Sequence, residues 1–216
     1  MTKKRVVHYI NQFYAGVGGE ESASIGLSER KGPIGPGQAL LSFLGDDYEI
    51  VKTIVCGDNT IAERTSSLLP KIVAMVRDAD ADLFVAGPGF NAGRYGIGCG
   101  AATSAVTEQL RIPAVTALFA ENPGTDLYKN RCYILQSDNN AKNMSKVLEQ
   151  IAVFAKRLIN KDAIKDGKKE HYHGSGPAVI IDYTIPASER GVDMLLTKYA
   201  NKPYKTEVVM PNHEEI

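Results

Sequence analysis

The sequence predicts an α/β protein with a doubly wound, mainly parallel sheet of the three-layer flavodoxin or Rossmann-like kind, followed by a C-terminal α/β extension. Two observations predict this fold class. Short runs rich in β-branched residues alternate along the chain with longer runs whose apolar residues recur at helical spacing. Glycines and polar residues follow the ends of the β-rich runs, where parallel sheets carry their binding loops. Alternating strands and helices favour a parallel sheet because each return to the same edge needs a crossover.

The same patterns place the elements in order along the chain. Five strands are expected, at residues 5–11, 49–55, 83–86, 114–119 and 132–136. Four helices are expected, at residues 37–44, 60–78, 100–111 and 144–158. Residues 12–36 are expected to form a long glycine-bearing loop. Pro70 is expected to kink the second helix or to mark its true start, because proline lacks the N–H that a helix interior needs.

The chain is expected to divide near residue 160. Residues 1–160 contain the five strands and form the α/β domain. Residues 161–216 are expected to form a polar linker and a C-terminal extension, with a further strand at 178–183 and a helix at 187–199.

Composition excludes several classes of protein. The formal net charge is zero and no Lys/Arg block exceeds a few residues, which argues against nucleic-acid or anionic-membrane partners. The apolar run near the N-terminus is too short for a signal peptide, and no run approaches membrane-spanning length. The three cysteines are widely spaced without a C-x-x-C pair, as expected of reduced thiols in a cytoplasmic protein.

The most informative segment is residues 87–100, which carries six glycines directly after a predicted strand. Glycines at this density are expected where the main chain turns tightly or lies against a ligand. Neither a G-x-G-x-x-G motif after the first strand nor a P-loop motif occurs, which argues against dinucleotide binding. The carboxyl ends of the predicted strands should gather one polar rim. Its members are Asn11, Gln12, Glu20, Glu21, Cys56, Asp58, Asn59, Glu121, Asn122, Ser137, Asp138 and Asn139.

Arg94 is the one cation of the glycine-rich segment. Its guanidinium suits a carboxylate or phosphate, but it could equally pair with an acidic side chain of this chain, namely Glu20, Glu21 or Glu121. Asn91 could orient a ligand or serve as a turn residue. Tyr95 could donate its hydroxyl to a ligand or simply pack over the loop.

Three further groups of residues are candidates for chemistry. Cys99 and Cys56 follow predicted strands, and Cys99 is expected beside a helix N-terminus, a setting that favours the thiolate; a buried structural role is the alternative. Cys132 is expected to be structural. Glu20 and Glu21 could act as acid–base groups, as ligands for an amine or as solvated loop carboxylates. His171 and His173 alone are weak evidence for a metal, and no metal site is expected.

Five segments of the sequence closely resemble the selenoprotein B family, the substrate-specific B components of glycine, sarcosine and betaine reductases. They are HYINQFYAGVGGEE, GPIGPG, CGD, AGPGFNAGRYGIGCG and ENPG, at residues 8–21, 32–37, 56–58, 86–100 and 121–124. The resemblance covers residues 5–160 and is weaker beyond them. It implies that residues 1–160 are a substrate-recognition domain.

The resemblance implies reductive cleavage of a C–N bond in an amino acid or an N-methylated derivative, within a system that forms acetyl phosphate. Expected partners are the small amine substrate, selenoprotein A, protein C and a selenium-bearing half or subunit, in an oligomeric assembly. No cofactor is expected on this chain. Members of the family are about twice as long as this sequence, and the resemblance implies a selenocysteine on the second half, which this sequence lacks. In glycine-type systems it also implies a pyruvoyl group on a partner subunit.

Substrate-binding roles are expected for Gly89, Asn91, Arg94, Tyr95, Glu121 and Asn122. Arg94 is expected to bind the substrate carboxylate while Asn91 and Tyr95 orient it. Glu121 or Glu20 is expected to stabilise the ammonium group. Cys99, Glu20 and Glu121 are the candidates for a catalytic role.

The sequence departs from the family in one respect. Members are about twice as long, and their selenocysteine lies in the second half, whereas this sequence contains neither selenocysteine nor C-x-x-C. We therefore expect an N-terminal domain, a truncated product or a split subunit that is inactive alone. Two alternatives stay open, namely a non-catalytic assembly domain of the complex and a stand-alone flavodoxin-like protein that binds a small anion or nucleotide.

Overall fold

A computed structural model describes residues 2–164, 167–174, 176–177 and 186–203. The chain divides into two compact units, residues 1–178 and residues 179–216. The first unit contains the sheet, and the second contains the helix α7 (Ala187–Tyr199), whose bounds match the predicted ones. The strand predicted at 178–183 lies outside the described residues. Within the described residues, no helix is both long and apolar enough to cross a membrane.

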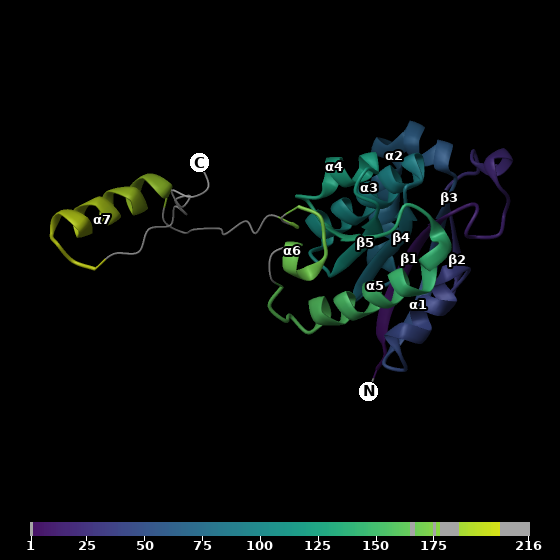
Figure 1. The fold of residues 1–216 in the computed structure, drawn as a ribbon, viewed down its shortest axis with the longest axis horizontal. Helices are drawn as coiled ribbons and strands as arrows, with labels where there is room; N and C mark the ends of the chain where they lie inside the picture. Colours follow the sequence, from purple (N-terminus) through teal and green to yellow (C-terminus); the bar gives the residue numbers. More distant parts are fainter. Residues whose placement is uncertain (1, 165–166, 175, 178–185, 204–216) are drawn as a thin grey trace. The chain divides into compact units, whose positions relative to one another are not determined.

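The first unit is built on one six-stranded sheet with the strand order β2-β3-β1-β4-β5-β6 (Figure 1). The strands are β1 (Lys4–Asn11), β2 (Ser28–Lys31), β3 (Tyr48–Cys56), β4 (Leu83–Phe90), β5 (Ala114–Leu118) and β6 (Tyr133–Gln136). Every neighbouring pair is parallel except the edge pair of β2 and β3. The predicted fold class and the five predicted strands are therefore confirmed.

The five parallel strands have the flavodoxin-like order. In chain order they are β1, β3, β4, β5 and β6, and in space β3 and β4 lie on either side of β1. The chain therefore reverses its direction of winding between β1 and β4. In open α/β sheets this switch point, at the carboxyl ends of the strands, is where ligands bind.

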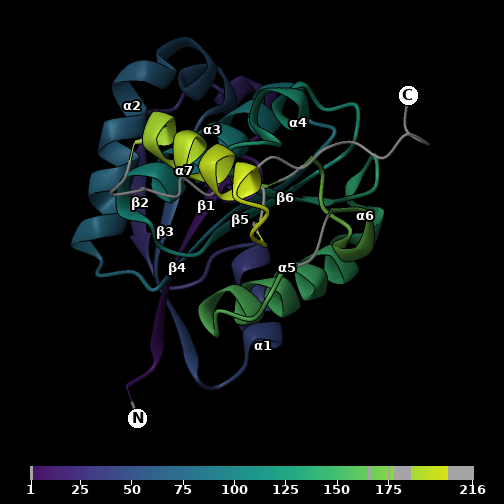
Figure 2. The same cartoon turned by 90° about the vertical axis from the view of Figure 1, so that its left-hand side faces the viewer.

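Helices cover both faces of the sheet, as Figures 1 and 2 show. On one face are α2 (Asp58–Asp78), α3 (Gly93–Leu110) and α4 (Pro123–Tyr128), and on the other are α1 (Pro36–Leu44) and α5 (Met144–Ile159). Short helical turns complete the unit, namely η1 (Glu20–Ser22), η2 (Ala141–Asn143) and α6 (Gly167–Glu170). Because helices cover both faces, β4 and β5 are buried along their whole length, as is usual for central parallel strands.

The start of α3 differs from the prediction. The helix begins at Gly93 rather than at residue 100, so half of the glycine-rich segment is helical rather than a loop. The reason is close packing between helices. A Cβ on Gly96 would collide with the side chain of Asn122, and a Cβ on Gly100 would lie 2.5 Å from the ring of Tyr128. These two glycines therefore let α4 approach α3 closely.

Three smaller features also differ from the prediction. Residues 12–36 contain β2 and η1 as well as loop, and residues 123–128 form α4. The helical path of α2 is interrupted at Arg64, six residues before Pro70. Residues 167–173, assigned to the linker, lie against the sheet, because Tyr172 is buried and pairs with Leu135 of β6. The predicted domain boundary near residue 160 stays a prediction.

Candidate functional site

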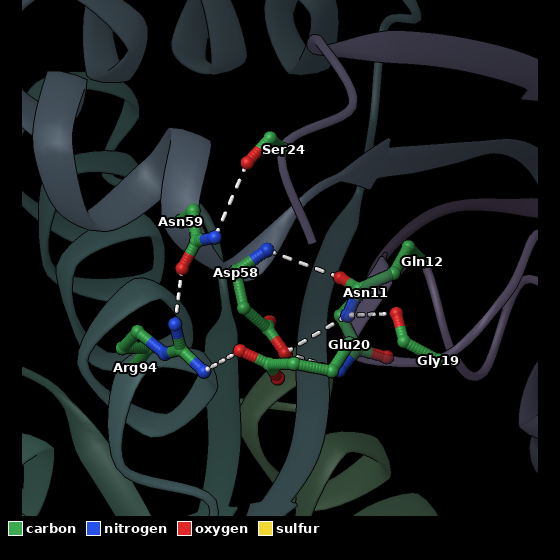
Figure 3. A network of polar contacts seen from close by, with 8 residues as sticks. All are labelled: Asn11, Gln12, Gly19, Glu20, Ser24, Asp58, Asn59 and Arg94. Carbon is green, nitrogen blue, oxygen red and sulfur yellow. Dashed lines mark hydrogen bonds and ion pairs between the residues drawn. The ribbon is translucent and has the colours of Figure 1, made fainter. Parts of the chain in front are cut away.

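Six polar side chains gather at the carboxyl edge of the sheet around the switch point, and we call them the switch-point cluster (Figure 3). They are Asn11, Gln12, Glu20, Asp58, Asn59 and Arg94. β1 ends at Asn11, α2 begins at Asp58 directly after β3, and Arg94 is in the first turn of α3 directly after β4. The cluster therefore joins the ends of the three strands that define the switch point.

Asp58 is at the centre of the cluster. Its Oδ2 accepts hydrogen bonds from Asn11 Nδ2 at 3.0 Å and Gln12 Nε2 at 3.2 Å, and its backbone N–H donates to Gln12 Oε1 at 3.0 Å. Burial raises the pKa of the Asp58 carboxyl, and the hydrogen bonds from Asn11 and Gln12 and the charge of Arg94 oppose that rise. The other oxygen, Oδ1, is buried without a hydrogen-bond partner among the described residues.

Arg94 forms the outer part of the cluster. Its Nη2 donates to Glu20 Oε1 at 2.5 Å, and its Nη1 donates to Asn59 Oδ1. Asn59 in turn donates to Ser24 Oγ at 3.2 Å. The Arg94 and Glu20 side chains are 46% and 71% exposed, so this is a surface ion pair, worth about 0–1 kcal/mol. Of the two roles predicted for Arg94, the structure contains the pair with an acidic side chain of this chain. Because that pair is weak, a ligand carboxylate could displace Glu20 at a small cost in free energy.

Aromatic rings lie beside Asp58. Tyr95 packs against Tyr9 of β1 and against Tyr14, with ring centroids 6.3 Å and 5.8 Å apart, and Phe13 meets Tyr14 at 5.4 Å. Tyr9 and Tyr95 are fully buried, and neither hydroxyl has a hydrogen-bond partner within the described part of the chain. The predicted packing role of Tyr95 is therefore present in the structure. Its contact with a ligand stays a prediction.

The setting predicted for Cys99 is wrong. The residue lies in the second turn of α3, fully buried, because the helix begins earlier than expected. Burial is the main influence on the Cys99 thiol and raises its pKa. The hydroxyls of Tyr95 and Thr116 lie near the sulfur and partly oppose this rise, although neither makes a hydrogen bond of normal geometry. Burial also raises the pKa of Cys56 to about 11 and that of Cys132 to about 12. All three cysteines are free and buried, and burial favours the protonated thiol.

The other predicted site residues lie outside this cluster of hydrogen bonds. Asn122 is buried and caps α4, since its Oδ1 accepts from Gly124 N at 2.9 Å. Its Nδ2 donates to the carbonyls of Phe90 and Ala92. Asn122 therefore ties α4 to the start of α3, and its side chain is fully engaged.

Gly89, Asn91 and Glu121 also lie apart from the network of Figure 3. Asn91 Nδ2 donates to Asn139 Oδ1 at 2.9 Å, which links the loops after β4 and β6. Gly89 is buried near the end of β4, and Glu121 is exposed. Their contact with substrate, and the catalytic candidacy of Glu20 and Glu121, stay predictions.

Sequence reasoning placed Asp58 on the polar rim but did not select it, and it treated Tyr9 only as part of a strand. Asp58 could have been found from its position, because it directly follows the strand that flanks β1. Tyr9 could not, because alternation alone does not show which buried strand residue has an unsatisfied hydroxyl.

The strand order and the polar cluster at the switch point place the chain in the class of doubly wound, flavodoxin-like α/β proteins. A family model described as "Glycine/sarcosine/betaine reductase selenoprotein B" matches residues 3–216. The chain belongs to this family. No solved structure matches the chain.

Curated relatives support the same family. The chain is 41% identical over 216 residues to component B subunit beta of the sarcosine reductase complex of Peptoclostridium acidaminophilum. It is 42% identical over 218 residues to component B subunit gamma of the glycine reductase complex of Peptoclostridium litorale. It is 33% identical over 215 residues to component B subunit beta of the betaine reductase complex of the first organism. These alignments cover 99–100% of this chain but 49–50% of each relative, so the chain spans about half the length of the curated relatives it matches.

Proposed function

We propose that this chain is the substrate-binding part of component B of a glycine, sarcosine or betaine reductase. The observation that carries the proposal is the position of Arg94. Its guanidinium lies at the switch point, in the first turn of α3, in a chain whose relatives are named for complexes acting on small amino acids.

Arg94 would hold the substrate carboxylate. A guanidinium can donate two parallel hydrogen bonds to a carboxylate, as it now donates one to Glu20. No side chain caps α3, so in this proposal the backbone N–H groups of its first turn also donate to the substrate carboxylate, which the helix dipole favours. In this proposal the substrate carboxylate takes the place of the Glu20 carboxylate, which now pairs with Arg94.

The reaction assigned to the complex is reductive cleavage of the C–N bond of the bound amine. In this proposal the amine leaves and the carboxymethyl group passes to a selenol of protein A. Protein C then forms acetyl phosphate with inorganic phosphate, and a thioredoxin system supplies the two electrons. The selenocysteine and the pyruvoyl group belong, in this proposal, to other parts of the complex. Cys99 is a poor substitute for selenium because it is buried and protonated. The isolated chain is therefore expected to bind substrate without turning it over.

Calorimetric titration of the chain with glycine, sarcosine and betaine tests the carboxylate role of Arg94. Arg94→Ala is expected to weaken binding of the preferred amine by about 10- to 100-fold, because a charged hydrogen bond contributes about 1.5–3 kcal/mol. Arg94→Lys keeps the charge without the planar fork and is expected to recover only part of the affinity. Unchanged affinity in Arg94→Ala would exclude this role.

A second candidate function, docking within the complex, rests on α7. Val192, Leu195, Leu196 and Tyr199 follow the i, i+3, i+4, i+7 spacing of one helix face, and all four are exposed within the described residues of their own unit. An exposed apolar stripe of this kind is typical of a protein-binding helix. Replacing Leu195 and Leu196 by Ser should abolish assembly with the other subunits without changing amine affinity if α7 serves docking. Unimpaired assembly would exclude that role.

A further inference from the structure

The core beside Arg94 contains buried polar atoms that lack hydrogen-bond partners within the described residues. On the face of the sheet that α2 and α3 cover, they are Tyr9 Oη, Tyr95 Oη, Asp58 Oδ1 and Thr116 Oγ1. A fifth, His8 Nδ1, is near Gly37 of α1 on the other face. More than nine in ten buried polar groups in proteins are satisfied, so several together indicate a missing partner.

The Tyr9, Tyr95 and Asp58 oxygens belong to one small region. The two tyrosine rings are 6.3 Å apart, and a Cβ on Gly98, one turn after Tyr95 in α3, would lie 3.2 Å from Tyr9 Oη. The charge of Asp58 contributes to the raised pKa of both tyrosines, although burial is the main cause. Tyr14 adds a third ring to the same group, 5.8 Å from Tyr95.

The chemistry of these groups indicates a cation as the missing partner. A carboxylate accepts hydrogen bonds but cannot donate them, and burial penalises its charge. Phenol oxygens also accept, and aromatic faces attract ammonium groups. An anion would be repelled by Asp58 and by the nearby Glu20. A metal ion would lack ligands, because no group of three His, Cys, Asp or Glu suited to a metal occurs in the described part of the chain.

Arg94 and Asp58 together offer the charges that a zwitterion needs. Glu20 pairs with Arg94 and also raises the pKa of Asp58, so its carboxylate is close to both residues, as Figure 3 shows. A ligand that displaced Glu20 could place its carboxylate on Arg94 and its ammonium toward Asp58. Displacement would cost little because the Arg94–Glu20 pair is exposed.

We propose that Asp58, with the hydroxyls of Tyr9 and Tyr95 and the rings of Tyr9, Tyr14 and Tyr95, forms a subsite for the ammonium group of the amine substrate. The assignment rests on the proposed function and differs from the sequence-based prediction, which gave this role to Glu20 or Glu121. In glycine and sarcosine the ammonium hydrogens donate to Asp58 Oδ1 and to the phenol oxygens. Betaine has no N–H, so its positive charge faces Asp58 and its methyl groups contact the rings. Entry requires side chains to move, because Tyr9 Oη, Tyr95 Oη and Asp58 Oδ1 are buried.

The test uses methylammonium and tetramethylammonium chloride, which carry the cation but no carboxylate. They are titrated into the full chain while tyrosine ring signals are followed by NMR. We expect both salts to shift the Tyr9 and Tyr95 signals in wild type and in Arg94→Ala. Asp58→Asn, which keeps the size and an acceptor oxygen, should weaken this binding about tenfold. The control is Asp126→Asn, which removes an exposed carboxylate paired with Lys129 and should change nothing.

Three results would overturn the subsite. The first is an absence of shifts at Tyr9 and Tyr95 with either salt, which would show that these oxygens do not bind a cation. The second is unchanged affinity in Asp58→Asn. The third is a loss of affinity in Asp126→Asn as large as that in Asp58→Asn, which would show that the salts respond to the overall charge of the chain rather than to Asp58. If Asp58→Asn does not fold, Tyr95→Phe serves as a second variant. It keeps the aromatic ring but removes one oxygen that accepts from the cation, so cation binding should weaken severalfold.

The test separates this inference from the proposed function. If the amino acids bind in an Arg94-dependent manner but the ammonium salts do not shift Tyr9 and Tyr95, the proposed function stands and the subsite is wrong. If the salts bind at Asp58 but glycine, sarcosine and betaine do not bind, the cation subsite stands and the substrate assignment is wrong.

Discussion

The charge of Arg94 opposes the rise in the pKa of the Asp58 carboxyl that burial causes. The two residues begin neighbouring helices, since Asp58 starts α2 and Arg94 is in the first turn of α3. One positive and one negative side chain thus flank the switch point of the sheet, with the exposed Glu20 carboxylate beside both. This arrangement underlies the first two predictions.

Removing the carboxylate of Glu20 is expected to tighten amine binding. Glu20→Gln leaves Arg94 without its ionic competitor, and an exposed pair is worth about 0.2–1 kcal/mol, so affinity should rise up to about fivefold. Calorimetric titration measures the change. Glu63→Gln, an exposed carboxylate on α2, is the matched control and should leave affinity unchanged. Weaker binding in Glu20→Gln would instead indicate that Glu20 itself contacts the ligand.

Asp58 is expected to make the folded chain less stable at neutral pH. Its folded pKa is raised, so ionisation is harder in the folded state than in the unfolded one, where Asp titrates near 3.9. Stability is therefore lost as pH rises from the unfolded pKa to the folded one. Asp58→Asn should be the more stable protein at pH 7, with the difference vanishing near pH 3. Thermal denaturation across this range measures it, and a variant less stable than wild type at pH 7 would contradict it.

The three thiols are expected to resist alkylation in the folded chain. Cys56, Cys99 and Cys132 are buried and their pKa values are raised, so little thiolate exists at pH 8. Mass spectrometry after treatment with iodoacetamide should show no label in the native chain and three labels after unfolding. Rapid native labelling of Cys99 would revive its candidacy as a nucleophile.

Two glycines of α3 should respond in opposite ways to the same substitution. Gly96→Ala places a Cβ against Asn122 and should lower the free energy of unfolding by about 1–3 kcal/mol. Gly93→Ala meets nothing within 4 Å and should be neutral or stabilise the chain by up to about 1 kcal/mol. Urea denaturation compares the two. Equal effects would mean that the close approach of α4 to α3 does not depend on Gly96.

The sequence predicted the parallel strands and the long helices because their apolar periodicity is strong. It missed β2 because Ser28–Lys31 is fully exposed and charged, as suits an edge strand, and therefore carries no alternation. It placed the start of α3 too late because glycine density usually indicates a loop. Here Gly96 and Gly100 serve contacts with α4, which only the three-dimensional structure reveals.

The candidate site was predicted in part. The position of the polar rim and the alternative pairing of Arg94 with Glu20 both follow from strand ends, which the sequence identifies. Asn122 caps α4 and supports α3, and its predicted contact with substrate stays a prediction. The position of Asp58 follows from the end of β3, but its unsatisfied Oδ1 could not be predicted, because only the structure shows that Asn11 and Gln12 both donate to Oδ2.

The most direct test of the account is a crystal structure of this chain with whichever of glycine, sarcosine and betaine binds most tightly. The account predicts the ligand carboxylate within hydrogen-bond distance of Arg94, with Glu20 displaced and the ammonium group facing Asp58 and Tyr95. An intact Arg94–Glu20 pair, with the amine bound elsewhere on the chain, would contradict it.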